Sequence, residues 1–324
     1  MKKICVAVIG CGRIAQVYLD IFEKLSDQID VIAAVDKELD KAQKFAAHFT
    51  NCLSFDNLDN ILDMPIDVLH ILTPHYLHKE HAIKALERDF NVLLEKPIAT
   101  TVEDGKAIIE AAQKSKGKLE VIFQNRYITG VEKLRRMILE NKTGLVKGVS
   151  SSLTWWRPPS YYECDWKGSW EKEGGGVVID QAIHSLDLVR YILQDEVDYL
   201  IGNIDRRVLT NIEVEDIAEA YLKFNKGTIY TFYACNYFFD NVPIRIDFYY
   251  ENGNATLLGE TMTITLNGKT HVYPNNTDQD VDESLSYWGK NHEKQVLHFY
   301  ESVRNDSEVF VTGQDALKTL ELVR

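Results

Sequence analysis

A histidine and two carboxylates are spaced to act together in the segment 174–188, which reads GGGVVIDQAIHSLDL. Asp180, His184 and Asp187 stand at i, i+4 and i+7, so a helix over 176–193 would place all three on one face. Ionisable groups among apolar neighbours are costly to desolvate unless paired, and such sites tend to be functional. We expect His184 to carry a proton, because histidine titrates near neutral pH. The alternative is a buried histidine satisfied by carboxylates, or an aspartate that caps a helix.

A glycine-rich turn near the start of the chain favours the functional interpretation. The apolar run 4–9 predicts a buried strand, and Gly10-Cys11-Gly12-Arg13-Ile14-Ala15 follows it as a G-x-G-x-x-A turn into a helix. The first glycine permits a tight turn, the second lets the backbone approach a pyrophosphate, and the alanine allows close helix–strand packing. Phosphates then lie on the amides of the helix N-terminus. We expect this turn to bind a dinucleotide through Gly10, Gly12, Arg13 and Ile14.

The next apolar run, 31–35, ends in Asp36. A carboxylate at this point accepts hydrogen bonds from the adenosine ribose hydroxyls. The 2′-phosphate of NADP would face it instead, at a cost of about 1–4 kcal/mol for charges about 4 Å apart. We therefore expect NAD rather than NADP, with Lys37 and Arg13 close enough in sequence to soften the preference. A solvated residue at a strand end is the alternative.

Two further strand ends carry polar residues, Thr73-Pro74 and Glu95-Lys96-Pro97. Ligands of open α/β sheets bind beyond the carboxyl ends of the strands, so both segments should line one site. The Lys96 cation could orient a substrate hydroxyl and stabilise a developing alkoxide, whereas a surface lysine is the alternative. We expect further cofactor contacts in this region from Thr73, Pro74, His78, Glu95 and Lys96.

Three histidines, His75, His78 and His81, raise the question of a metal site. On a helix their side chains would fan over a wide arc, and no cysteine or carboxylate set completes a site. We expect no metal.

The aromatic stretch before the glycine run contains Arg157, which could bind a carboxylate or phosphate. Most of the aromatic rings in this stretch should pack in the interior. We expect substrate contacts from Lys96, Arg126, Arg157, Tyr162, Trp166, Asp180 and His184.

Composition narrows the class of protein. The chain has 324 residues, a formal net charge of −13 and no long basic run, which argues against nucleic-acid binding. No apolar stretch reaches the roughly 20 residues that span a bilayer. Five scattered cysteines without C-x-x-C spacing suggest free thiols in a reducing compartment, so we expect a cytoplasmic protein.

The pattern of elements changes near Arg126. Before it, apolar strands alternate with amphipathic helices, as in a parallel sheet covered by helices. After it, alternating runs and the turn signals at 225–227 and 252–254 predict a largely antiparallel sheet that carries the 176–193 helix. The predicted class is therefore α/β: a Rossmann dinucleotide-binding domain over 1–124 and an α+β domain over 125–324. The predicted strands are 4–9, 31–35, 67–72, 91–95, 119–123, 146–156, 197–208, 217–224, 228–236, 244–250 and 254–258, and the predicted helices are 13–25, 38–48, 77–88, 103–115, 130–141, 176–193, 289–304 and 313–323.

In this order, the landmarks resemble the glucose-fructose oxidoreductase / inositol dehydrogenase / MocA family. The motifs that carry the resemblance span nearly the whole chain: GCGRIA at the start, TPHYLH at 73–78, EKP at 95–97, GGGVVIDQAIHSLD at 174–187 and GQDALKTLE at 313–321. The resemblance implies an open sheet that forms a homo-oligomer, dimer or tetramer, and a cis peptide between Lys96 and Pro97. Family members usually continue the final helix, so it also implies a further segment after Arg324.

The resemblance further implies NAD(P)-linked oxidation of a hydroxyl on a sugar, cyclitol or sugar derivative. Lys96 matches the family's EKP lysine, Asp180 its pocket aspartate and His184 its proton-transferring histidine. The chain departs from the usual pattern at Ala182, His75, Asp89 and Asn91, which puts cofactor grip and pocket shape in doubt but leaves the chemistry intact. Two rivals remain: a glycosidase on the same fold that uses held NAD transiently, and a non-catalytic NAD- and sugar-binding regulator.

Overall fold

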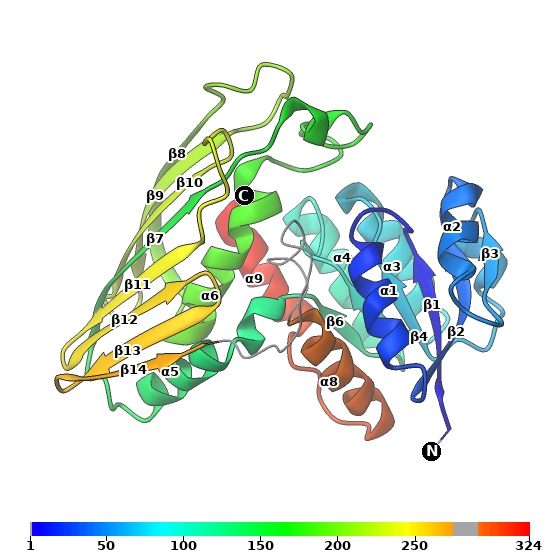
Figure 1. Ribbon diagram of the computed structural model, residues 1–324, viewed down its shortest axis with the longest axis horizontal. Helices are drawn as coiled ribbons and strands as arrows, with labels where there is room; N and C mark the ends of the chain where they lie inside the picture. Colours follow the sequence, from blue (N-terminus) through cyan, green and yellow to red (C-terminus); the bar gives the residue numbers. More distant parts are fainter. Residues whose placement is uncertain (1, 275–290) are drawn as a thin grey trace. The chain divides into compact units, whose positions relative to one another are not determined.

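A computed structural model describes residues 2–274 and 291–324, which form two compact units (Figure 1). The first unit contains the chain up to Ile122 together with the C-terminal helices, and the second runs from Phe123 through the last strand. The predicted domain division between residues 124 and 125 lies next to this break. Among the described residues, no helix is both long and apolar enough to cross a lipid bilayer.

The first unit is built on a six-stranded parallel sheet with strand order β3-β2-β1-β4-β5-β6. This is the order of a doubly wound dinucleotide-binding fold, which changes direction between β1 and β4. Apart from the edge strand β3, its strands are mostly buried, as expected for a parallel sheet covered on both faces. The strands are β1 (Ile4–Ile9), β2 (Ile29–Val35), β3 (Leu53–Phe55), β4 (Val68–Ile71), β5 (Asn91–Leu94) and β6 (Leu119–Val121).

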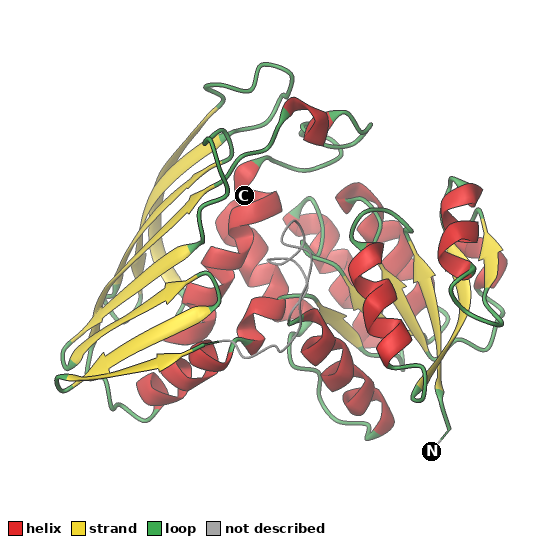
Figure 2. Ribbon diagram, in the orientation of Figure 1, coloured by secondary structure: helices red, strands yellow, loops and turns green. Residues whose placement is uncertain are grey.

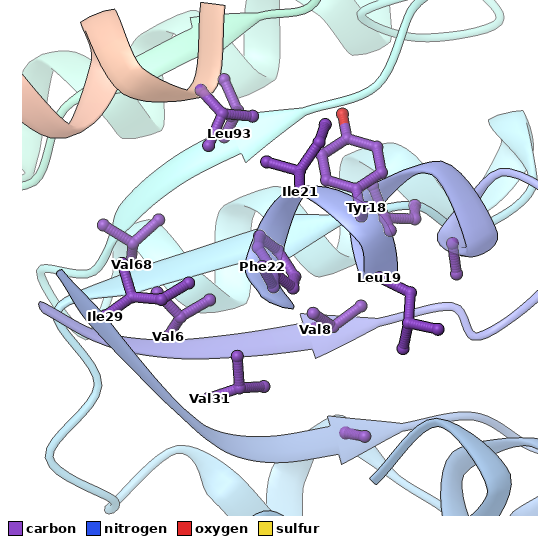
Figure 3. Close-up of a cluster of buried hydrophobic side chains, with 14 of the residues drawn as sticks. Val6, Val8, Tyr18, Leu19, Ile21, Phe22, Ile29, Val31, Val68 and Leu93 are labelled. Carbon is purple, nitrogen blue, oxygen red and sulfur yellow. The ribbon is translucent and has the colours of Figure 1, made fainter. Parts of the chain in front are cut away.

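The helices of this unit follow the predicted alternation, and two more come from the C-terminal end of the chain. They are α1 (Ala15–Lys24), α2 (Leu39–Ala46), α3 (His78–Leu86), α4 (Val102–Lys114), α8 (His292–Arg304) and α9 (Gly313–Val323). Helix α1 buries Tyr18 and Phe22 in the core cluster on the sheet (Figure 3). Phe299 and Tyr300 of α8 are buried in the same cluster, so α8 extends the core of the first unit.

The placement of α8 and α9 corrects the predicted extent of the second domain. We expected 125–324 to form that domain, but both helices belong to the first unit. Helix α9 packs there through Leu317, whose side chain lies against Gly105 of α4. Amphipathic spacing indicates that a helix has an apolar face, but not which sheet that face covers.

The second unit is built on an eight-stranded sheet with strand order β14-β13-β12-β11-β7-β10-β9-β8. All neighbouring strands pair antiparallel except β7 with β10. Strands β13 and β14 are additional to the predicted ones, and the tight Asn267-Gly268 turn joins them with positive φ at both residues. The strands are β7 (Val146–Thr154), β8 (Val197–Asp205), β9 (Ile217–Phe224), β10 (Ile229–Cys235), β11 (Arg245–Tyr250), β12 (Gly253–Leu258), β13 (Thr261–Leu266) and β14 (Lys269–Tyr273).

Helices α5 (Thr129–Leu139) and α6 (Ile183–Leu193) cover one face of this sheet (Figure 2). Residues alternate between the two faces along each strand, so the covered face carries the buried residues. In β9, Leu222 and Phe224 are buried, whereas Tyr221 and Lys223, which point to the other face, are exposed. Helix α5 approaches so closely at Gly130 that a Cβ there would collide with Met262 of β13. No described helix covers the opposite face.

The predicted helix over 176–193 is not a single α-helix. Residues Val178–Ala182 form a π-helical turn, and the regular helix α6 begins only at Ile183. The wider turn changes the angular relation between Asp180 and His184 from the one that α-helical spacing predicts. Such turns inside helices often accompany functional sites.

Candidate active site

Four of the predicted segments follow strands of the first sheet that end in register. Ile9 of β1 pairs with Val35 of β2 and with Ile71 of β4, which in turn pairs with Leu94 of β5. The chain leaves these four positions into Gly10, Asp36, Leu72-Thr73 and Glu95-Lys96. The predicted cofactor segments therefore share the carboxyl edge of one parallel sheet, beside the point where strand order reverses.

The glycine turn fits a pyrophosphate. Gly10 has φ +94°, and a Cβ there would lie 2.6 Å from the backbone carbon of Leu72, so the turn requires glycine. At Gly12 a Cβ would meet no heavy atom within 4 Å, which leaves the backbone open to a ligand. Ile14 is the N-cap of α1, and Arg13 precedes it in the turn.

Asp36 fixes the shape of the same turn. Its two carboxylate oxygens accept hydrogen bonds from the backbone amides of Cys11 and Glu38, each at 2.9 Å. The carboxylate is thus held at the end of β2 and against the glycine turn. This location fits a group that binds the ribose next to the pyrophosphate.

His78, a predicted cofactor contact, connects two segments of the carboxyl edge through its ring. The side chain is fully buried, and its Nδ1 and Nε2 face the carbonyl oxygens of Pro97 and Thr73 at 2.7 and 2.9 Å. Burial lowers the pKa of His78, against the raising effect of these carbonyls. The ring connects the end of β4 to the turn after β5, so we assign it a positioning role. Thr73 itself is buried, and its hydroxyl lies 3.1 Å from Nδ1 of His81.

Glu95 is likewise turned into the protein. Its Oε1 accepts a hydrogen bond from the Tyr18 hydroxyl at 2.8 Å and lies 3.4 Å from Nε2 of His292. Burial alone would raise the pKa of Glu95, but His292, Lys96 and Tyr18 lower it to about 2. Ionised Glu95 therefore stabilises the fold above pH 4.5, and this contribution is lost as the pH falls through 2. These contacts anchor Glu95 at the end of β5, and its predicted cofactor contact stays a prediction.

Lys96 follows this anchored carboxylate directly. Its backbone amide donates to Oε2 of Glu95 at 3.2 Å, and the Lys96-Pro97 peptide is cis, which confirms the prediction from the family resemblance. The lysine is half-buried at the carboxyl edge of the sheet. Its backbone amide is therefore held by Glu95 at the edge where a substrate or cofactor would bind.

In the second unit, Asp180 lies in a buried cluster that the sequence did not reveal. Its Oδ2 accepts hydrogen bonds from the Tyr161 hydroxyl at 2.7 Å, Nζ of Lys167 at 2.7 Å and Nε2 of Gln181 at 2.6 Å. Lys167 also donates to Glu173 at 2.9 Å. The WKG and KEGGG segments place these charged residues just before the glycine run, and this proximity in sequence is the signal that could have found them.

His184 lies in the first turn of α6, within the segment that carries Asp180. Its ring meets the ring of Phe123 edge-on, with the centroids 5.9 Å apart. The side chain is half-buried, so it is held by packing yet reaches the surface of the unit. This placement fits a proton carrier.

Asp187, the third of the residues spaced with Asp180 and His184, forms an ion pair with Arg126. Nε of Arg126 donates to it at 2.8 Å and Nη2 to its second oxygen, and both side chains are almost fully buried. Arg126 also stacks on Tyr191, with its guanidinium carbon 4.7 Å from the ring centroid. Its Nε and Nη2 donors therefore face a buried carboxylate that holds α6 in place, and the substrate contact predicted for Arg126 stays a prediction.

The remaining predicted substrate contacts form part of an aromatic stack. The Arg157 guanidinium is buried, lies over the rings of Trp155 and Tyr161, and donates to the Asn241 side chain at 3.0 Å. The Lys167 ammonium lies 4.3 Å from the ring centroid of Trp166.

The hydroxyl of Tyr162 accepts a hydrogen bond from Asn236 at 2.6 Å, and the side chain is buried. Nη1 of Arg157 and the hydroxyl of Tyr162 thus bond to protein groups, and a substrate contact from either residue stays a prediction. Within residues 2–274 and 291–324, no group of three potential ligand side chains could hold a metal ion.

Comparison with known proteins places the chain in a family. Residues 4–123 match the model of the GFO/IDH/MocA oxidoreductase family, NAD-binding Rossmann fold, and residues 131–256 match the GFO/IDH/MocA C-terminal domain. The chain belongs to this family and is an NAD(P)-dependent oxidoreductase with a Rossmann unit and a second, mostly antiparallel sheet.

Three relatives are distant in sequence but align over nearly the whole chain. Glucose-6-phosphate 3-dehydrogenase of Bacillus subtilis is 23% identical and covers 100% of this chain and 95% of the relative. The scyllo-inositol 2-dehydrogenase (NAD(+)) of the same organism is 25% identical, with 98% and 91% covered. The crystal structure of the WlbA dehydrogenase from Chromobacterium violaceum, in complex with NADH and UDP-GlcNAcA, aligns with a TM-score of 0.85 and 27% identity over 99% of this chain and 92% of that one.

Proposed function

We propose that this protein is an NAD-dependent dehydrogenase that oxidises one hydroxyl of a sugar, cyclitol or sugar derivative, with Lys96, Asp180 and His184 as its catalytic residues. The observation that supports this most strongly is the aligned carboxyl edge of the first sheet, where the glycine turn, Asp36 and Lys96 follow strands in register. Relatives that act on glucose 6-phosphate and scyllo-inositol support the substrate class.

The chemistry divides among the three side chains. His184 removes the hydroxyl proton, and Lys96 binds the same oxygen and stabilises the negative charge that develops on it. Asp180 accepts a hydrogen bond from the substrate and so orients the ring. When bound, nicotinamide supplies the redox step by accepting the hydride. The residues hold the carbinol in one geometry, which contributes much of the rate acceleration.

The function and the cofactor preference are tested together by a panel of sugars and polyols with NAD and NADP, followed by the absorbance of the reduced cofactor. We expect reduction with at least one substrate and a preference for NAD of about tenfold to several hundredfold, because the 2′-phosphate of NADP would face Asp36. D36N should reduce that preference, since the amide keeps an acceptor for Cys11 but loses the charge. If the native protein uses NAD and NADP equally well, the predicted preference for NAD is wrong.

The same panel separates the rival functions. Release of an aglycone without net reduced cofactor would identify a glycosidase on this fold. Binding of NAD and a sugar without any turnover would identify a regulator. The lysine, the aspartate and the histidine together argue against the regulator, because binding alone needs no proton carrier.

We also propose a homo-oligomer, dimer or tetramer, formed through the outer face of the second sheet. One row of paired residues crosses this face and ends in apolar side chains: Ile201 is 58% exposed, Tyr221 39% and Val272 60%. Exposed apolar side chains on an uncovered sheet face are typical of a subunit interface.

Sedimentation of the variant I201K/Y221K is expected to show monomers at concentrations where the native protein is a dimer or tetramer. L53K is the matched control, because Leu53 is 56% exposed in the first unit. A native protein that sediments as a monomer would refute the proposed assembly.

The five cysteines are all unpaired, which supports a reducing, cytoplasmic location.

A further inference from the structure

Lys167 is held between two carboxylates in the interior of the second unit. Its Nζ lies 2.7 Å from Oδ2 of Asp180 and 2.9 Å from Oε1 of Glu173. The three side chains are 11%, 9% and 1% exposed, respectively. A buried lysine is costly unless its charge is compensated, and here Asp180 and Glu173 compensate it.

Two aromatic rings also lie against the ammonium group of Lys167. Nζ lies 4.6 Å from the ring centroid of Tyr161 and 4.3 Å from that of Trp166, within the range of cation–π attraction. The Tyr161 hydroxyl also donates to the Asp180 oxygen that Lys167 contacts. Lys167, Tyr161 and Asp180 therefore form a closed triangle in which each group restrains the other two.

The charges favour one ionisation state of the lysine. Burial would lower the pKa of Lys167, but Asp180, Tyr161 and Glu173 raise it well above its ordinary value. The lysine is therefore an ammonium ion throughout the neutral range. Glu173 is anchored in turn, because its second oxygen accepts a hydrogen bond from the backbone amide of Gly168.

We propose that Lys167 is a positioning residue for the reaction: its ammonium group, anchored by Glu173 and by the rings of Tyr161 and Trp166, holds the Asp180 carboxylate in the orientation that binds the substrate. This inference rests on the proposed catalytic role of Asp180. Lys167 does not itself touch the reacting atoms. It belongs to the same unit as Asp180, so its effect reaches the reaction through that carboxylate.

The test compares K167M, K167R and the control K172M in the full-length protein, with the substrate found in the panel. Methionine keeps the apolar stem between the rings and removes the charge, and arginine restores it. We expect K167M to lower kcat/KM by about 100-fold through misplacement of Asp180, with unchanged NAD affinity. K167R should recover most of this loss, and K172M should match the native protein, because Lys172 bonds the Asp165 carbonyl instead.

A double-mutant cycle decides whether Lys167 acts through Asp180. If it does, K167M/D180N is no slower than D180N alone, because the lysine has nothing left to orient. Losses that multiply in the double variant, or a K167M protein with native kcat and KM, would overturn the inference. A D180N protein with near-native turnover would instead refute the proposed function, so the two failures are distinguishable.

Discussion

Replacement of His184 with alanine is expected to lower kcat by about 10²–10⁴-fold and to leave the affinity for NAD within about twofold of native. The loss follows from removal of the general base, whose contribution to catalysis lies in that range. NAD affinity is preserved because the glycine turn and Asp36 belong to the first unit, whereas His184 lies in the first turn of α6 in the second. Steady-state kinetics and a titration of NAD by fluorescence measure the two quantities separately.

The control for this prediction is H271A, which removes an exposed histidine from β14 of the same unit. H271A should retain native kinetics. If H184A keeps near-native kcat at saturating substrate, another group removes the proton, and the role assigned to this histidine is wrong. Weakened NAD binding with unchanged kcat would point to a structural role instead.

The elements of the first unit were predictable because their signals are local. The run 4–9 is apolar throughout, and a glycine turn follows it, so β1 and the start of α1 need no knowledge of distant residues. The family to which the chain belongs, its fold class and its NAD cofactor were predicted correctly. The location of α8 and α9 was not, since the sheet that an amphipathic helix covers depends on the whole fold.

In the candidate site too, features set by the local sequence were predictable, whereas features set by distant residues were not. Gly10 and Asp36 are specified by their places after strands, and the structure gives both the backbone environment that the prediction requires. The ion pair of Arg126 was not predictable, because its partner, Asp187, is 61 positions away. The π-helical turn at Val178–Ala182 was also beyond prediction, because residue spacing does not reveal which carbonyl an amide selects.

The ion pair between Arg126 and Asp187 leads to the largest expected effect on stability. R126M should lower the free energy of unfolding of the second unit by about 3–5 kcal/mol, because it leaves the Asp187 carboxylate buried without its cation. Methionine retains an apolar side chain beside Tyr191, so most of the loss is electrostatic. Urea unfolding followed by tryptophan fluorescence measures it, since four of the five tryptophans, 155, 156, 166 and 170, lie in this unit.

The double variant R126M/D187L separates the loss of a charge partner from the loss of packing. With both charges replaced by apolar groups, no carboxylate is stranded, and most of the stability should return. R126K should fall between the native protein and R126M, because lysine keeps the charge but cannot form the bidentate contact. If R126M unfolds with the same urea midpoint as the native protein, the ion pair contributes nothing to stability. The position of α6 in the second unit would then depend on its apolar contacts alone.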